Sequence, residues 1–180
     1  MALTATMYRW QVNVSDVDRG VYTTLDLRLA QHPSESLRYL VTRALAYCLS
    51  YEDGIAFSKG GISSTDEPPV SVHDPTGLLT AWIDVGAPTA ERLHKAAKAA
   101  PKVVLFTSSD LVALRREATG IHRVETIEVF RIEQRLIDEI AERVERNLSL
   151  ELTRSDGHLY VTVAGQTLSG SIEPQSLVER

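Results

Sequence analysis

The sequence lacks the residues that build several common kinds of functional site. It has one cysteine, Cys48, so no disulfide can form within the chain, and its apolar helical context favours a buried, unreactive thiol. The five histidines show no paired H-x-x-x-H spacing, which argues against zinc. The sequence also has no GxGxxG motif, no Walker loop and no nucleophile elbow, so it supports neither a nucleotide-binding nor a serine-hydrolase interpretation.

Long apolar segments and an excess of positive charge are absent as well. No apolar run is long enough to span a bilayer, and residues 1–9 lack the hydrophobic region of a signal peptide, so we expect a cytoplasmic protein without a membrane partner. The formal net charge is −5, whereas proteins that bind nucleic acid non-specifically usually carry a basic face. This charge lowers the expectation of strong, sequence-independent binding without excluding a local basic patch.

The hydrophobic pattern predicts one α/β domain over residues 1–180, with a mixed central sheet flanked by helices. Hydrophobic residues make up 43% of the chain, enough for a substantial core. Periods of two and of three to four residues predict, in order, a hairpin within residues 8–29, a helix at 33–51, a strand at 55–58, a loop at 59–65, a hairpin at 69–86, a helix at 89–99, a strand at 103–107, a helix at 109–118, a strand at 124–129, a helix at 132–144 and a hairpin at 148–163. We expect the tail after Gly170 to be loose.

Turn positions predict the registers of the first two hairpins. Folding the first about residues 15–20 places Trp10 opposite Leu25, with both apolar sets on one face. The second turns at residues 74–77, whose Asp-Pro-Thr-Gly sequence is typical of a type I turn. Its register then places Glu67 opposite Asp84 on one face of the sheet.

Asp84 is the most informative candidate residue, because it ends a nearly all-apolar segment at residues 78–85 that we interpret as a buried strand. A buried carboxylate needs partners, and two carboxylates about 5 Å apart favour a shared cation or proton. A divalent metal held by Glu67 and Asp84 is one interpretation. In the alternative, Asp84 caps the helix that starts at Pro88, or pairs with Arg92 or Lys95.

Two other acidic segments have structural interpretations. Asp74 lies in the predicted turn, and the seven residues 78–84 span roughly 20 Å in a strand, so we interpret it as a turn residue and not as a metal ligand. Asp16, Asp18 and Arg19 lie between the first two strands, where they could bind a ligand. We favour a solvated hairpin tip.

Several segments resemble the YaeQ family along nearly the whole chain. They comprise residues 1–3, residues 12–19, His32-Pro33-Ser34-Glu35, Asp66-Glu67-Pro68, Trp82-Ile83-Asp84-Val85-Gly86-x-Pro88, Arg92-x-x-Lys95-Ala96 and the strand at 103–107. The resemblance implies a variant of the PD-(D/E)XK nuclease fold, with an α-β-β-β-α-β core over residues 33–107 and added β-hairpins at both ends. That order agrees with the elements predicted from periodicity.

The resemblance also implies a Mg²⁺ site, in which Mn²⁺ can substitute. Asp66 or Glu67 would be the first acid and Asp84 the second, and a lysine two residues after the second acid would help activate water. In this sequence Gly86 stands at that position.

A cation from the following helix could replace the missing lysine. Arg92 and Lys95 lie three residues apart, so both can point at the site. In the alternative interpretation, Arg92 and Lys95 lie on a solvated face of the helix, where Lys95 forms an ordinary ion pair with Glu91. Glu35 could add a further acid from the first helix, or could stabilise the N-terminus of that helix.

Two functions follow. The first is a Mg²⁺-dependent phosphodiesterase that acts on nucleic acid, with Asp66, Glu67, Asp84 and Glu35 at the metal and with Asp84, Arg92 and Lys95 in the chemistry. The second is a non-catalytic protein that keeps the nuclease scaffold to bind a protein or a nucleic acid. The missing motif lysine and the negative net charge motivate the second.

Overall fold

A computed structural model describes residues 4–59 and 66–179 of the chain. Most of the predicted loop at 59–65 therefore lies outside the described residues. The elements are β1 (Thr6–Asp16), β2 (Val21–Gln31), α1 (Leu37–Leu49), β3 (Ile55–Phe57), β4 (Val70–His73), β5 (Leu79–Val85), α2 (Ala90–Ala99), β6 (Lys102–Thr107), α3 (Val112–Arg116), the 3₁₀ turns η2 (Ala118–Gly120) and η3 (Val124–Thr126), β7 (Glu128–Ile132), α4 (Gln134–Ala141), β8 (Asn147–Ser155), β9 (His158–Val163) and β10 (Gln166–Gln175).

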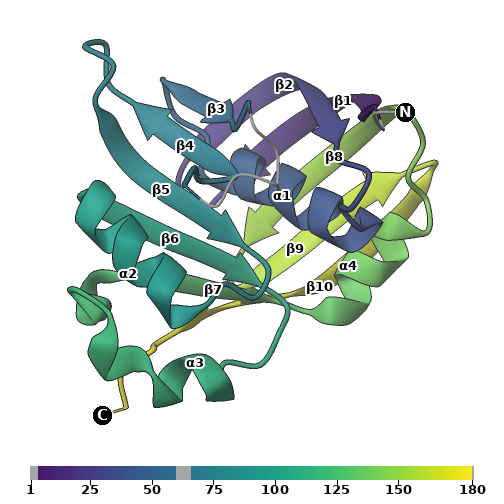
Figure 1. The fold of residues 1–180 in the computed structure, drawn as a ribbon. Helices are drawn as coiled ribbons and strands as arrows, with labels where there is room; N and C mark the ends of the chain where they lie inside the picture. Colours follow the sequence, from purple (N-terminus) through teal and green to yellow (C-terminus); the bar gives the residue numbers. More distant parts are fainter. Residues whose placement is uncertain (1–3, 60–65, 180) are drawn as a thin grey trace.

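These strands form one sheet of ten, in the order β2-β1-β8-β9-β10-β7-β6-β5-β4-β3. The first hairpin, β1–β2, joins the hairpin β8–β9, because β1 and β8 pair in parallel. Strands β5, β6 and β7 are parallel neighbours, whereas β3, β4 and β5 are antiparallel. The sheet curves strongly, with α1 on its concave side (Figure 1).

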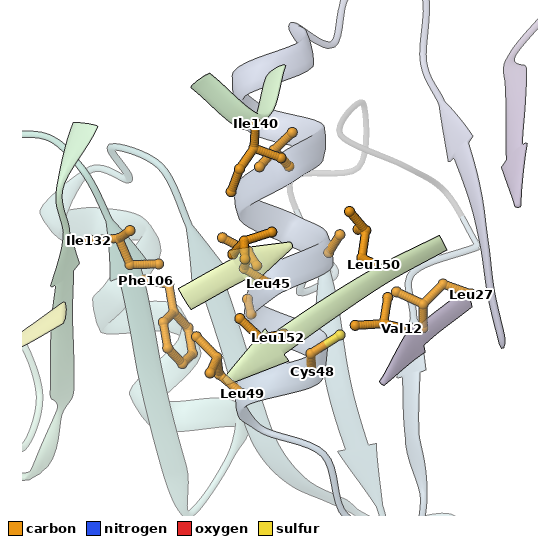
Figure 2. Packing of buried hydrophobic residues seen from close by; sticks show 14 of the residues in the cluster. Val12, Leu27, Leu45, Cys48, Leu49, Phe106, Ile132, Ile140, Leu150 and Leu152 are labelled. Atoms are coloured by element: carbon orange, nitrogen blue, oxygen red, sulfur yellow. The ribbon is translucent and has the colours of Figure 1, made fainter. Parts of the chain in front are cut away.

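Helix α1 fills the concave side of the sheet. Ser36 caps its start by accepting a hydrogen bond from the backbone N–H of Tyr39, and nine of its thirteen residues are buried. The helix contacts β1 and β2 from one half of the sheet and β3 to β6 from the other. Figure 2 shows Leu45, Cys48 and Leu49 of α1 among side chains from both halves. A helix that is apolar on nearly every side is a core element, so α1 holds the two halves together.

Helix α2 covers the convex side and forms a second, smaller core. Thr89 caps its start, and Leu93 is buried against the sheet with Trp82 of β5 and Leu105 of β6. The helix contacts β5 and β6. Because α2 follows β5 after a short turn, its first turn lies beside the carboxyl end of that strand (Figure 1).

The predicted order of elements from residue 33 to residue 107 is confirmed, as are the hairpins at both ends. The predicted registers are wrong by two residues. Trp10 pairs with Leu27, because the chain continues as a strand to the buried Asp16 before turning. In the second hairpin Val70 pairs with Ile83, because a bulge and a longer turn displace the ladder. A two-residue shift keeps every side chain on its predicted face.

Other predicted boundaries also need correction. The first helix begins at Leu37, so Pro33 precedes it, and the segment predicted as a strand at 124–129 begins as the turn η3. The tail that we expected to be loose is the strand β10, which pairs with both β9 and β7. Gly170 disfavours a strand by propensity, yet a Cβ there would lie 2.8 Å from the Cβ of Leu136 in α4. Close packing of α4 on β10 therefore requires the glycine that suggested a loop.

Two glycines with positive φ allow a direct test of how closely the α1–β3 turn approaches β4. Gly54 (φ +90°) joins α1 to β3, and a Cβ there would overlap the carbonyl oxygen of His73, whereas Gly165 (φ +77°) has open space around it. We expect Gly165→Ala to cost about 1–2 kcal/mol through backbone strain alone. Gly54→Ala adds a clash with backbone and should cost roughly 1–3 kcal/mol more. Urea unfolding of the two variants measures the difference, and equal losses would contradict the close approach.

Candidate functional site

Asp84 lies at the carboxyl end of β5 and is almost completely buried, with 1% of its surface exposed. Its Oδ2 accepts hydrogen bonds from Nε of Arg92 at 2.7 Å and from Nε1 of Trp82 at 3.3 Å. Its Oδ1 accepts one from the backbone N–H of Val85 at 3.1 Å. Both carboxylate oxygens thus have protein donors, and the shortest contact is with a cation.

Arg92 connects the end of β5 to the segment that precedes β4. Its Nη2 donates to the backbone carbonyl of Glu67 at 3.0 Å, and its guanidinium lies 5.5 Å from the centre of the Trp82 ring. The Thr89 hydroxyl accepts from the backbone N–H of Arg92, which fixes this residue in the first turn of α2. Of the alternatives for Asp84, the pairing with Arg92 is therefore confirmed.

The acids ahead of β4 do not face Asp84 across a strand ladder. The Glu67 side chain is exposed and accepts a hydrogen bond from the Ser58 hydroxyl at 2.8 Å. Asp66 is exposed and forms no hydrogen bond or ion pair with any residue that the structure describes. The predicted pairing of Glu67 with Asp84 is wrong, because β4 begins only at Val70.

Glu35 belongs to a second buried ion pair. It precedes the Ser36 cap, so the interpretation that placed it in the first turn of α1 is wrong. Its Oε2 lies 3.0 Å from Nε of Arg43, and its Oε1 accepts from Nη2 of Arg43 at 3.1 Å and from the backbone N–H of His32 at 3.2 Å. Arg43 also donates to the carbonyl of Ala30. Glu35 is thus held by Arg43 and is not directed to Asp84.

Tyr39 lies between the two ion pairs and was missed by the sequence reasoning. Its pKa is raised to about 12, first by burial and then by the carboxylates of Asp84 and Glu35, while Arg92 and Arg43 oppose the shift. Recognising it required knowing that α1 passes beside the end of β5.

The position of the missing lysine has a structural explanation. Gly86 has φ +81°, a conformation that side chains rarely adopt, and a Cβ there would touch the Tyr39 ring at 3.5 Å. Of the two cations on α2, the structure brings Arg92 to the site, while Lys95 is exposed and contacts neither Asp84 nor Glu91 among the described residues.

The interpretation of Asp74 as a turn residue is confirmed. Its Oδ1 accepts hydrogen bonds from the hydroxyl and backbone N–H of Thr76 and from the backbone N–H of Leu78. The bond from the Thr76 hydroxyl is the largest of the effects that lower the pKa of Asp74.

The solvated tip that we favoured for the first hairpin is wrong for Asp16, whereas Asp18 and Arg19 are exposed. Asp16 is fully buried, and Arg19 donates to the carbonyls of Leu49 and Tyr51 at the end of α1.

The residues of the candidate site do not fit a Mg²⁺ ion as they are arranged. Magnesium needs carboxylate oxygens that are free to ligate it. Here Asp84 is neutralised by Arg92, Glu35 by Arg43, and Glu67 points to Ser58, so that of the four predicted ligands only Asp66 has no partner among the described residues. No group of three or more acidic, histidine or cysteine residues in the described part of the chain could hold a metal. The requirement for Mg²⁺ or Mn²⁺ stays a prediction.

Comparisons with known proteins identify the family. The model of the YaeQ protein family matches residues 1–172. The YaeQ protein of Salmonella typhi is 29% identical over 171 residues, which cover 93% of this chain and 94% of that protein. The YaeQ protein of Escherichia coli K12 is 28% identical over 165 residues, covering 90% and 91% respectively. The chain therefore belongs to the YaeQ family.

Solved structures of the family have the same fold. The YaeQ protein from Pseudomonas syringae superposes with a TM-score of 0.87 at 26% identity, covering 96% of each chain. The YaeQ protein from Xanthomonas axonopodis pv. citri gives 0.87 at 27% identity and covers 96% of this chain and 99% of the other. Among the helices that the structure describes, none is long and apolar enough to cross a membrane.

The buried ion pair on α1 can be tested against an exposed one on the same helix. Arg43→Ala leaves Glu35 buried without its cation, which should cost about 3–5 kcal/mol. The control is Arg38→Ala, because Arg38 pairs with Asp138 at 2.7 Å while 61% exposed, and such pairs contribute about 0–1 kcal/mol. Denaturant unfolding measures both losses, and a loss for Arg43→Ala no larger than the control's would contradict the assignment.

The position of Tyr39 predicts a pH dependence of stability. The folded protein holds the phenol proton more tightly than the unfolded chain, in which the pKa is 10.0. The protonated phenol of Tyr39 therefore makes its full contribution to the free energy of unfolding below pH 10.0, and this contribution is lost as the pH rises towards 12. We expect Tyr39→Phe to lose less stability than the wild type over this range in thermal melts. Parallel losses in the two proteins would contradict the placement of Tyr39 beside the carboxylates.

Proposed function

We propose that this chain keeps the core of a PD-(D/E)XK nuclease and uses it to bind a partner without cleaving it. The observation that carries the proposal is the 2.7 Å ion pair between Asp84 and Arg92. It places a guanidinium where a nuclease of this type would need a metal ion. The partner is a nucleic acid or a protein, and a cytoplasmic location remains part of the proposal.

The topology supports the nuclease-like core. Helix α1 is followed by the antiparallel strands β3, β4 and β5, then by α2, and then by β6, which is parallel to β5. The Asp66-Glu67-Pro68 segment precedes β4, and Asp84 ends the neighbouring strand. The acids of the motif therefore belong to the same end of two adjacent antiparallel strands, as the PD-(D/E)XK arrangement requires.

The chemistry of the site supports binding over cleavage. A hydrolytic site needs a group that accepts a proton near neutral pH, and a guanidinium has no free lone pair for it because it stays protonated in proteins. Arg92 cannot fill that role in place of the motif lysine. Position 86 is a glycine where a Cβ would touch the Tyr39 ring, and Lys95 is exposed and forms no ion pair with Asp84. A guanidinium is suited to holding a phosphate or carboxylate group of a partner.

A second candidate is a Mg²⁺-dependent phosphodiesterase that acts on nucleic acid. One observation favours it. The buried carboxylate of Asp84, which is 1% exposed, is linked through Arg92 to the backbone carbonyl of Glu67 in the acidic segment ahead of β4. Asp84 with Asp66 or Glu67 would then be the metal ligands. Glu35 and Lys95 would have to leave their present positions to take part.

Titration calorimetry with Mg²⁺ and Mn²⁺, combined with cleavage assays on single- and double-stranded DNA and RNA, separates the two candidates. For the binding function we expect the wild type and Asp84→Ala to behave alike, without one-site ion binding and without cleavage. Glu91→Ala, which removes an exposed acid beside Arg92, is the matched control. One-site binding and cleavage that are lost in Asp84→Ala but kept in Glu91→Ala would overturn the proposal in favour of the phosphodiesterase.

A further inference from the structure

A cavity lies at the other end of the parallel strands from Asp84. Its volume is about 230 Å³, and it opens on the concave side of the sheet, where α1 ends and where β6 and β7 begin. Its apolar floor includes Ile83, Val104, Phe106 and Phe130. Its rim carries both signs of charge, from Asp18, Glu52, Glu128, Arg19, Lys102 and Arg154.

Two aromatic rings give the floor a flat surface. Phe106 of β6 and Phe130 of β7 pair directly in the parallel ladder, and their rings stack with centres 5.4 Å apart and planes inclined by 24°. Aromatic side chains of this kind offer a large apolar contact area at fixed geometry. The floor thus suits a planar or compact apolar group.

Arg154 of β8 provides a positive charge at one side of the cavity. Its side chain is only 12% exposed, and its guanidinium lies 4.9 Å from the centre of the Phe130 ring. The nearest acid is Asp18, whose Oδ2 is 3.6 Å from Nε, beyond hydrogen-bonding distance. Nε is buried without a hydrogen-bond partner, and no described residue accepts a hydrogen bond from the other guanidinium nitrogens. A largely buried arginine with unused donors indicates that an anion completes its bonding.

The other two cations at the rim differ from Arg154. Arg19 donates to the carbonyls of Leu49 and Tyr51 and lies 3.7 Å from Asp16, so it holds the end of α1. Lys102 lies 3.6 Å from Glu128 but is 53% exposed, so water can accept hydrogen bonds from its ammonium group. Arg154 is therefore the largely buried cation with unused donors that an anion entering the cavity meets.

We propose that this cavity binds a small organic monocarboxylate, with its apolar body against Phe106 and Phe130 and its carboxylate on Arg154. The volume of about 230 Å³ is smaller than the usual range for drug-sized ligands, so the ligand is small. The three acids at the rim balance its three cations, so the rim has no excess of positive charge to hold a multiply charged anion such as phosphate, which favours a single negative charge. The inference is independent of the Asp84 site and of the partner proposed for it.

Calorimetry with 3-phenylpropionate as the probe tests the proposal. The wild type should bind it at one site and at least tenfold more tightly than the neutral 3-phenylpropan-1-ol or inorganic phosphate. Arg154→Met should weaken binding of 3-phenylpropionate at least tenfold. The matched control is Arg131→Met, because Arg131 neighbours Phe130 on β7 but is exposed and does not line the cavity.

Amide chemical shifts of the wild type provide a measurement that needs no variant. Addition of 3-phenylpropionate should shift the amides of Phe106, Phe130 and Arg154 and leave those around Asp84 in place. The proposal is overturned if the wild type does not bind the probe, if phosphate or the alcohol binds as tightly, if Arg154→Met folds and binds as the wild type does, or if the shifts lie elsewhere.

Discussion

The enclosure of α1 by the curved sheet is the constraint on which the rest of the structure depends. The helix contacts strands from both halves of the sheet, and its buried side chains merge with theirs into one core. The β1–β8 pairing joins the N-terminal hairpin to the C-terminal strands β8 and β9 on one side of it. Arg19 of the first hairpin binds the last carbonyls of α1, so the end of the helix is also fixed. Each candidate site lies at one end of this helix.

This enclosure dictates the chemistry beside the helix. Glu35 and Asp84 are taken out of water near the start of α1, and a buried carboxylate stays charged only beside a well-placed cation. Arg43 and Arg92 supply those cations with short contacts, and Tyr39 lies between the two pairs with a raised pKa. A metal ion at Asp84 would have to displace a guanidinium that is also bonded to the backbone of Glu67. Each buried carboxylate at this site is therefore already paired with an arginine.

Hydrophobic periodicity predicted most of the elements, and it failed where tertiary contacts overrule local preference. The strand β10 was missed because Gly170, which suggests a loop, is required by the close packing of α4. Both hairpin registers were two residues off, because turn length depends on contacts such as the burial of Asp16 that a pattern does not contain. At the site, Asp84 and Arg92 were both named from the sequence. Tyr39 and the Glu35–Arg43 pair emerge only when α1 is placed against the sheet.

The central claim is that Arg92, and not a metal ion, neutralises Asp84. Crystals of the protein soaked in Mn²⁺ and measured at a wavelength where manganese scatters anomalously test it most directly. The account predicts no anomalous peak within bonding distance of Asp84 and an intact contact between Arg92 Nε and Asp84 Oδ2 near the 2.7 Å found here. A manganese peak on Asp84, with Arg92 turned away, would contradict it and would restore the metal-dependent nuclease as the better description of the site.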